Sequence, residues 1–295
     1  MEIERNQGHR LLVRAFALAV LFGAGLWLRT FQPLNLAAAV PWPWSSTAVV
    51  TLYFADGPFL FPVSRRMALE PELPHKAVEA LLAGPPPGNR LKNPLPPGVA
   101  LRSLRVDGSV AYVDLSGPME TIRSTPAGLT ALVATITRLP GLSSAVVTVD
   151  GAPLVSPSTR PPLVYYSSPH GLVASPVAAT GPRAALDTFL AGAPAPELTS
   201  LPSDARLIAY EFSAADGVLS LRFAYTPSVR TLAIQRPDRM RFLLLGLIAT
   251  LTDFREVRAV HLDFGGQSRL GLGACSDLLR TPQPRPALLN DERLL

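Results

Sequence analysis

The sequence predicts an α/β (α+β) protein made of two tandem copies of one unit, each with two helices covering one face of a mixed sheet. Three observations lead to this prediction. Strand-like and helix-like segments alternate along the chain. The stretch KAVEALLAGPPPG at 76–88 returns as AALDTFLAGAPAP at 184–196, and the flanking segments recur in the same order. The 295 residues are enough for two domains of ordinary size, and an apolar content of 48% supports a packed core.

The first copy is predicted to contain a hairpin, a helix, a second hairpin, a second helix and a closing strand. Both hairpins join β-branched or alternating runs through an Asp-Gly turn. The first helix has Val78, Leu81 and Leu82 on one face and stops at Gly84. The second helix carries an apolar stripe. These elements span residues 49–63, 71–84, 101–115, 125–139 and 145–151.

The second copy repeats the five elements after Pro161, at residues 162–177, 184–192, 207–224, 239–254 and 259–265. Its second helix contains FLLLGLIATL, which is apolar on more than one face. Such a helix is usually buried on both sides, so we expect it to pack on its own sheet and on the first copy. The predicted regions are an N-terminal stub, anchor and neck, a first domain, a second domain and a Pro-rich tail, at 1–47, 48–156, 157–274 and 275–295.

The N-terminal segment is expected to target the chain to the cytoplasmic membrane. Arg5, Arg10 and Arg14 lead into an apolar stretch, and residues 11–31 are long enough to form a single-pass anchor. The basic flank places the N-terminus inside and the bulk of the chain outside the cytoplasm. A cleaved signal peptide is the alternative, because Ala37–Ala39 offers small residues for processing. No cysteine follows the apolar stretch, so we expect no lipid anchor.

Charge and residue chemistry argue against several function classes. The net charge of +5 is spread along the chain without a basic block, so no nucleic-acid partner is expected. The acids Glu79 and Asp187 match between the copies, but each is expected on a solvated helix face. The histidines show no metal spacing, and the single Cys275 is expected to be a small buried or semi-exposed residue. We therefore predict no catalytic, cofactor-binding or metal-binding residues, and no enzyme. The histidines are His9, His75, His170 and His261.

Several stretches together resemble the GerMN domain family. They are the strand ending in Tyr-Phe, the helix ending LLAGP, the hairpin PPGVALRSLRVDGSVAYVDLS at 96–116, and the strand AVVTVDG. The resemblance covers 49–154 strongly and 162–268 more weakly. It implies a non-enzymatic role in sporulation or germination, as an assembly factor at the cell envelope with envelope or sporulation-complex proteins as partners. The second copy departs from the pattern, because Arg222 stands opposite Asp114.

The candidate interaction surface lies on the first copy, which follows the family pattern more closely. It consists of residues expected to be exposed, namely Arg65, Arg66, Arg90 and Arg123. The family's fold is said to resemble ring-building modules, which implies that surfaces and sheet edges carry the function. Two alternatives remain open. One is a module that binds peptidoglycan or another envelope component without a sporulation role, and the other is a cell-wall hydrolase.

Overall fold

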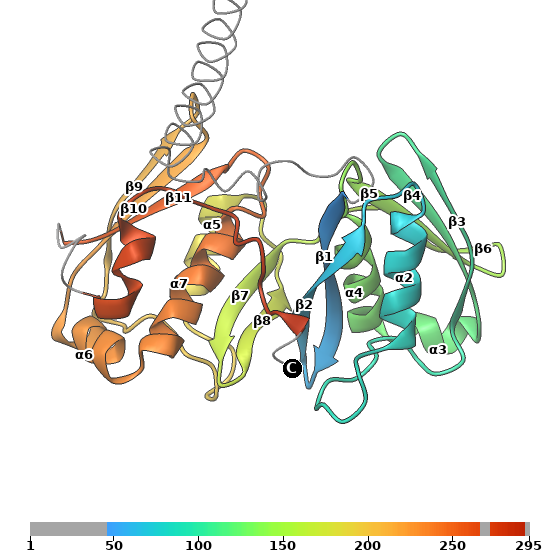
Figure 1. Cartoon of the computed structure of the whole chain (residues 1–295), viewed down its shortest axis with the longest axis horizontal. Coiled ribbons are helices and arrows are strands. Elements are labelled where there is room, and N and C mark those ends of the chain that lie inside the picture. The colour runs from blue at the N-terminus through green and yellow to red at the C-terminus, as the bar shows by residue number, and fades with distance from the viewer. Residues whose placement is uncertain (1–45, 266–271, 293–295) are drawn as a thin grey trace, which may run out of the picture. The chain divides into compact units, whose positions relative to one another are not determined.

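The computed structural model describes residues 46–265 and 272–292. These residues form three four-stranded sheets with helices between them (Figure 1). The expected anchor at 11–31 lies outside the described residues. Among the helices that are described, none is long and apolar enough to cross a membrane.

The first copy contains all five predicted elements and adds one short helix and one strand. In chain order it consists of β1 (Thr47–Asp56), β2 (Phe59–Ala68), α2 (Leu73–Ala83), β3 (Ala100–Asp107), β4 (Val110–Ser116), α3 (Met119–Arg123), α4 (Pro126–Ile136), β5 (Ser144–Val149) and β6 (Ala152–Thr159). The added elements are α3 and β6. Strand β6 continues three residues past 156, where we expected the domain to end.

The second copy follows the same order. It consists of β7 (Leu163–Ser168), β8 (Gly171–Pro176), α5 (Pro182–Leu190), β9 (Leu207–Ser213), β10 (Val218–Phe223), α6 (Pro227–Gln235), α7 (Pro237–Leu251), β11 (Ala259–Phe264), the 3-10 helix η2 (Gly273–Leu279) and β12 (Gln283–Pro284). The prediction of two helices per copy is therefore wrong. Each copy has three α-helices, because the loop before the second long helix forms a short helix of its own, α3 or α6.

The prediction that all strands of a copy belong to one mixed sheet is also wrong, because the first hairpin of each copy lies in a different sheet. The two hairpins pair with each other in the order β1-β2-β8-β7, and we call this the joint sheet (Figure 1). Strands β2 and β8 are antiparallel, and Leu60 pairs with Ala174. A lone two-stranded hairpin is marginally stable, and β1 buries Leu52, Tyr53 and Phe54 in succession. Sharing a sheet gives both hairpins the partners they need.

The other strands form one mixed outer sheet in each copy, β3-β4-β5-β6 and β12-β11-β10-β9. In each outer sheet the two central strands are parallel, β4 with β5 and β10 with β11. Helix α4 contacts both β1 and β5, and α7 contacts both β7 and β11. Each copy therefore places its helices between the joint sheet and its outer sheet.

Local sequence explains where the helices begin and end. Five of the helices have a proline in the first two positions, where a missing N–H costs nothing. Helix α2 ends at Gly84, whose φ of 83° is unfavourable for other residues. Asn93 donates to the carbonyl oxygen of Leu82 at 2.6 Å and so caps the same end. Of the three residues predicted on the packed face of this helix, Val78 and Leu81 are fully buried and Leu82 is half-buried.

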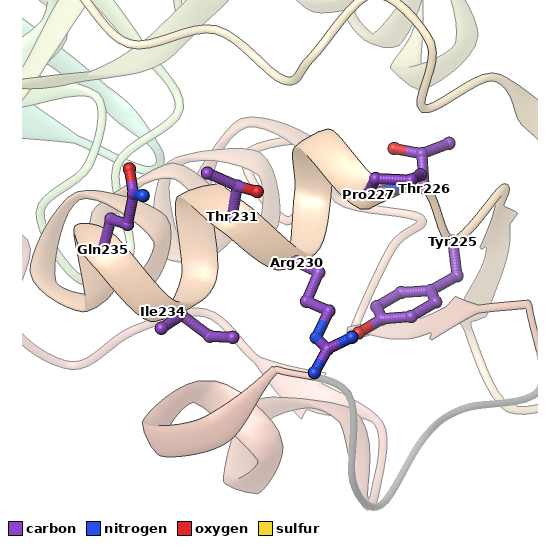
Figure 2. Close-up of a pocket in the computed structure, with 7 residues that line it drawn as sticks. All are labelled: Tyr225, Thr226, Pro227, Arg230, Thr231, Ile234 and Gln235. Carbon is purple, nitrogen blue, oxygen red and sulfur yellow. The ribbon is translucent and has the colours of Figure 1, made fainter.

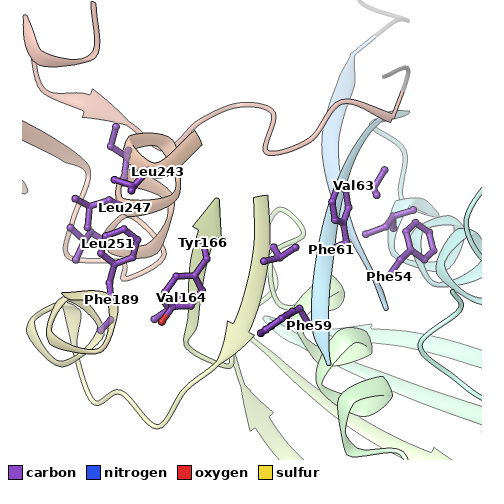
Figure 3. Packing of buried hydrophobic residues seen from close by; sticks show 14 of the residues in the cluster. Phe54, Phe59, Phe61, Val63, Val164, Tyr166, Phe189, Leu243, Leu247 and Leu251 are labelled. Carbon is purple, nitrogen blue, oxygen red and sulfur yellow. The ribbon is translucent and has the colours of Figure 1, made fainter. Parts of the chain in front are cut away.

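The core is apolar and continuous on both sides of the joint sheet (Figure 3). In the second copy, Tyr166 of β7 stacks on Phe189 of α5, with ring centroids 5.8 Å apart. Figure 3 shows Leu247 and Leu251 of α7 beside this pair. Helix α7 has no room for a side chain at Gly246, where an added Cβ would lie 2.7 Å from the carbonyl oxygen of Tyr165. The glycine lets α7 approach β7 closely.

Candidate functional site

A buried junction holds the two copies together and fixes the spacing of the surfaces that a partner could meet. A separate apolar cluster lies here, with Tyr53 and Ala134 from the first copy and Tyr165 and Ala249 from the second. Helix α7 contacts β7 and β11 of its own copy, and its Ala249 belongs to the same apolar cluster as Tyr53 and Ala134 of the first copy. The described residues from Thr47 onward form one compact unit.

Equivalent residues meet at the centre of this junction. The hydroxyl oxygens of Tyr53 and Tyr165, at matching positions of β1 and β7, are 2.7 Å apart and share a hydrogen bond. Thr135 accepts from the backbone N–H of Tyr53, and Thr250 accepts from that of Tyr165. Both acceptors therefore cap an edge strand of the joint sheet from a helix. The copies are related by a pseudo-two-fold axis through this point.

Just past the ends of the two helices, matching positions of the two copies carry opposite charges. Arg138 follows α4 and Asp253 follows α7 at matching positions, and they form an ion pair with side chains only 6% and 3% exposed. Arg160 and Arg285 also reach Asp253, at 3.7 Å and 3.1 Å. Three arginines thus surround a single buried carboxylate.

Helix ends balance the excess positive charge. Arg138 donates to the carbonyl of Ala134, Arg160 to that of Thr137, and Arg285 to that of Ala249. These carbonyls lie at the C-terminal ends of α4 and α7, where about half a negative charge per helix gathers. The guanidinium groups therefore cap two helices as well as pairing with Asp253.

The cluster also fixes its own protonation. Burial raises the pKa of Tyr53 well above its ordinary value, so its hydroxyl stays protonated. Burial disfavours charge on Arg138, while the charge and hydrogen bond of Asp253 favour it, and the pKa of this guanidinium is raised. Arg138 and Arg285 also lie over the rings of Tyr53 and Tyr165, at 5.3 Å and 5.7 Å from the centroids. We therefore interpret this cluster as structural: it holds the two copies together, and we call it the lock.

The C-terminal segment adds further hydrogen bonds across the junction. Asn290 donates to the carbonyl oxygens of Pro62 in β2 and Leu172 in β8, and accepts from the Leu172 N–H. In the antiparallel register of the Leu60–Ala174 pair, Pro62 lies opposite Leu172. Proline has no N–H to donate, so the direct hydrogen bond to Leu172 cannot form. The Asn290 amide fills that gap in the ladder.

The four predicted surface arginines do not converge. Arg65 pairs with Glu292 of the C-terminal segment, and Arg90 pairs with Asp56 while lying 5.1 Å from the centroid of the Phe61 ring. Arg123 pairs with Glu120 on α3 and remains exposed. Arg66 is exposed and has no ion-pair partner within residues 46–265 and 272–292. It lines a hollow of about 240 Å³ together with Arg65 and Glu292.

A larger hollow of about 550 Å³ lies along α6 in the second copy (Figure 2). In Figure 2, Tyr225 and Arg230 point to one end of it, and Ile234 lies one turn further along the helix. Ile234 is 63% exposed, the highest value among the large apolar side chains of the described chain. This open hollow presents a cation, a phenol and an apolar side chain, which suits a contact with a larger partner.

The outer sheets of the two copies carry different polar groups at matching positions. In β4, Asp114 accepts from the Thr148 hydroxyl at 2.6 Å and from the Gly151 N–H at 2.9 Å, and these bonds lower the pKa of its carboxyl. In β10, Arg222 occupies that position and donates to Asp263 at 2.9 Å. The second copy thus has an arginine where the first copy has Asp114, and this arginine pairs with Asp263 on the neighbouring strand β11.

The remaining candidate residues have structural partners. Glu79 pairs with His75 and Asp187 with Arg183, each one helical turn apart on an exposed face, as expected. Cys275 is buried, and burial raises the pKa of its thiol. Within the part of the chain that the structure describes, no three His, Cys, Asp or Glu side chains come close enough to hold a metal ion.

Sequence reasoning missed the junction cluster, although a signal for it was present. The copies align at a constant offset through ATITR at 134–138 and ATLTD at 249–253, which already sets Arg138 against Asp253. Polar residues that recur at the end of two apolar helices indicate a shared polar contact. Only the pseudo-two-fold axis shows that they contact each other.

Comparison with known proteins finds one family model that matches part of the chain and solved structures of similar fold. Residues 51–155 match the family model Germane, described as sporulation and spore germination. The tandem GerMN domains of the sporulation protein GerM from Bacillus subtilis share the fold, with a TM-score of 0.60 at 15% identity, over 83% of this chain and 99% of that chain. No curated protein matches.

Two shorter structures match part of the chain. The first GerMN domain of the same Bacillus subtilis protein has a TM-score of 0.30 at 16% identity, over 39% of this chain and 96% of that chain. A putative lipoprotein from Clostridium perfringens has a TM-score of 0.26 at 20% identity, over 39% of this chain and 89% of that chain.

Proposed function

The chain contains a Germane (GerMN) domain at residues 51–155 and has the fold of tandem GerMN domains, and from this premise we propose a function. We propose that it is a non-enzymatic, membrane-anchored, extracytoplasmic protein of sporulation or germination. It acts as an assembly factor, through contacts with envelope or sporulation-complex proteins. The anchor is the N-terminal segment 11–31, and the surfaces outside the junction make the contacts.

The match of residues 51–155 to a family of sporulation and spore germination carries this proposal. The tandem arrangement supports it, since the Bacillus subtilis protein that shares the fold is also a sporulation protein with two GerMN domains. The likeness at 15% identity concerns the fold, so the biological role rests on the family match and must be tested directly.

The geometry supports a role in assembly because the junction fixes the spacing between two different outer surfaces. Three arginines and a tyrosine pair lock the copies together, and Asn290 fastens β2 to β8. A partner would therefore meet one rigid body. Arg66 is the best placed of the four candidate arginines, because its charge is not already paired within the described residues.

Deletion of the gene in its host, followed by microscopy of sporulating cells and a germination assay, tests the proposed role. We expect arrested or defective spores, and rescue by the full-length chain. The double variant Arg66→Glu/Arg123→Glu should rescue poorly. Arg183→Glu is the matched control, since Arg183 is an exposed arginine in the second copy and should rescue fully. Normal sporulation and germination in the deletion strain would contradict the proposal.

Two assays on the detergent-solubilised full-length chain address the alternatives. In a zymogram with cell-wall substrate we expect no clearing, and clearing that persists through purification would overturn the non-enzymatic proposal. In co-sedimentation with purified peptidoglycan we expect the chain to stay in the supernatant. Salt-resistant co-sedimentation would favour an envelope-binding module instead.

A further inference from the structure

Strand β9 is an edge strand of the outer sheet of the second copy. Strand β9 forms the end of the order β12-β11-β10-β9, and within residues 46–265 and 272–292 it pairs with β10 alone. At the opposite edge, the two-residue strand β12 of the C-terminal segment pairs with Ala259 and Val260 of β11. An edge strand presents backbone N–H and C=O groups that can pair with another chain, so natural edges usually carry protection.

The equivalent edge of the first copy shows what this protection looks like. Strand β3 pairs with β4 as β9 pairs with β10, and each ladder has an irregularity at one position, Arg102 in β3 and Ile208 in β9. Arg102 and Arg105 of β3 have side chains 58% and 67% exposed. Charged side chains on an edge discourage pairing, and here there are two.

Strand β9 lacks both of these arginines. The register puts Ile208 in place of Arg102, Glu211 in place of Arg105 and Phe212 in place of Val106. Ile208 is 59% exposed and Phe212 is 41% exposed. An apolar edge with one acidic residue invites a strand partner, whereas the matching edge of the first copy deters one.

We propose that β9 pairs antiparallel with β9 of a second copy of this chain, about a two-fold axis at Tyr210. In that register Tyr210 faces its own copy, Ile208 faces Phe212 twice, and Glu211 faces Ala209. No like charges lie opposite each other, and the apolar side chains meet. The strand is therefore complementary to itself.

Charge complementarity supports the same occupant. Glu211 is exposed and has no ion-pair partner in the described part of the chain. In the proposed register it faces Ala209 of the second chain, and the residue paired with Ala209 on β10 is Arg222. The Arg222 side chain is 57% exposed and lies on the same face as Glu211. Two symmetric Glu211–Arg222 ion pairs would then form between the chains. The pairing of the two β9 strands would join two four-stranded outer sheets into one sheet of eight strands.

Cysteine cross-linking of the full-length chain in detergent tests this contact. In a Cys275→Ser background, Tyr210→Cys should give a disulfide-linked dimer on mild oxidation, because the residue on the two-fold axis meets its own copy. Leu104→Cys, the matching position in β3, is the control and should stay monomeric. Absence of the Tyr210→Cys dimer, or equal cross-linking of the control, would overturn the proposal. Thermal unfolding of each variant checks that it is folded.

A second variant leaves Tyr210 in place. Ile208→Arg/Glu211→Arg gives β9 the arginines of β3, removes apolar cross-strand pairs and reverses the charge facing Arg222. Sedimentation equilibrium should show the dimer dissociation constant rising about tenfold or more. A dimer that this variant does not weaken, or a wild-type chain that stays monomeric throughout, would refute the contact. Neither outcome bears on the sporulation role, which the deletion strain tests separately.

Discussion

The two copies share hydrogen-bonding residues at the junction and carry opposite charges at a matching position of their outer sheets. At the junction, Tyr53 and Tyr165 form one hydrogen bond between equivalent residues, and Thr135 and Thr250 cap equivalent strands. On the outer sheets the same alignment sets Asp114 against Arg222. The inner surfaces must fit each other, so they keep matching groups, while each outer surface can suit a partner of its own.

The difference at the centre of the junction is equally informative. A strictly symmetric contact would set two arginines, or two aspartates, against each other across the axis. Arg138 and Asp253 replace that repulsion with a buried ion pair. The pair therefore favours contact between a first and a second copy over contact between two like copies. The tandem chain supplies both halves together.

Breaking this ion pair should have the largest effect on stability. Asp253→Ala leaves three arginines around an empty position, and removing one partner of a buried pair costs about 3–5 kcal/mol of unfolding free energy. Urea unfolding of the full-length chain measures this loss. The reversal Arg138→Asp/Asp253→Arg should not recover it, because the new arginine would face Arg160 and Arg285. Arg183→Ala, at the exposed Arg183–Asp187 pair, should cost about 0–1 kcal/mol. Equal losses at both sites would contradict a buried lock.

Filling the close approach of α7 to the joint sheet should have the next largest effect. In Gly246→Ala the new methyl would meet the Tyr165 carbonyl oxygen at 2.7 Å, so α7 must move away from β7. Overpacking of this kind costs about 1–3 kcal/mol, which thermal unfolding measures. Gly181→Ala is the control, because no heavy atom lies within 4 Å of the added Cβ. An unchanged melting temperature for Gly246→Ala would show that the helix is not held in contact.

Removing the hydrogen bonds of Asn290 should lower the free energy of unfolding by a smaller amount. Asn290→Ala leaves the Leu172 N–H and the Pro62 carbonyl without the amide that bonds them, which costs about 1–2 kcal/mol. Hydrogen exchange should show faster exchange at Leu172, while the amides of β4 stay protected. Faster exchange throughout both copies would mean that the segment supports the whole fold and not the junction alone.

The smallest effect should be a pH dependence of stability that arises from Asp114 in the outer sheet of the first copy. The pKa of Asp114 is lowered in the folded state by its bonds from Thr148 and Gly151. Its contribution is therefore complete above the unfolded pKa of about 4 and is lost as pH falls below that value. Asp114→Asn should lower the melting temperature at pH 6 and have less effect at pH 3. An equal loss at both pH values would contradict this assignment.

The sequence predicted the local elements and missed the long-range pairing, for physical reasons. Periodicity and turn chemistry report on neighbouring residues, so the two hairpins and two long helices of each copy were predictable. The joint sheet depends on residues such as Leu60 and Ala174, which are far apart in the chain. The helix α3 has five residues and β12 has two, too few for a period to appear.

The candidate site was predictable only in part. The buried Cys275 and the exposed helix acids follow from residue type and helix face. The arginines were chosen for expected exposure, and the partners that engage Arg65 and Arg90 come from distant segments. Glu292 lies far from Arg65 in the chain, so no local pattern could have shown that the C-terminal segment reaches it.

Differential scanning calorimetry of the full-length chain tests the central claim most directly. If the junction makes the two copies one rigid body, the copies should unfold in a single transition whose calorimetric and van't Hoff enthalpies agree. The Asp253→Ala variant should split that transition or lower its cooperativity. Two separate transitions in the wild-type chain would contradict the account, because the copies would then unfold as independent domains.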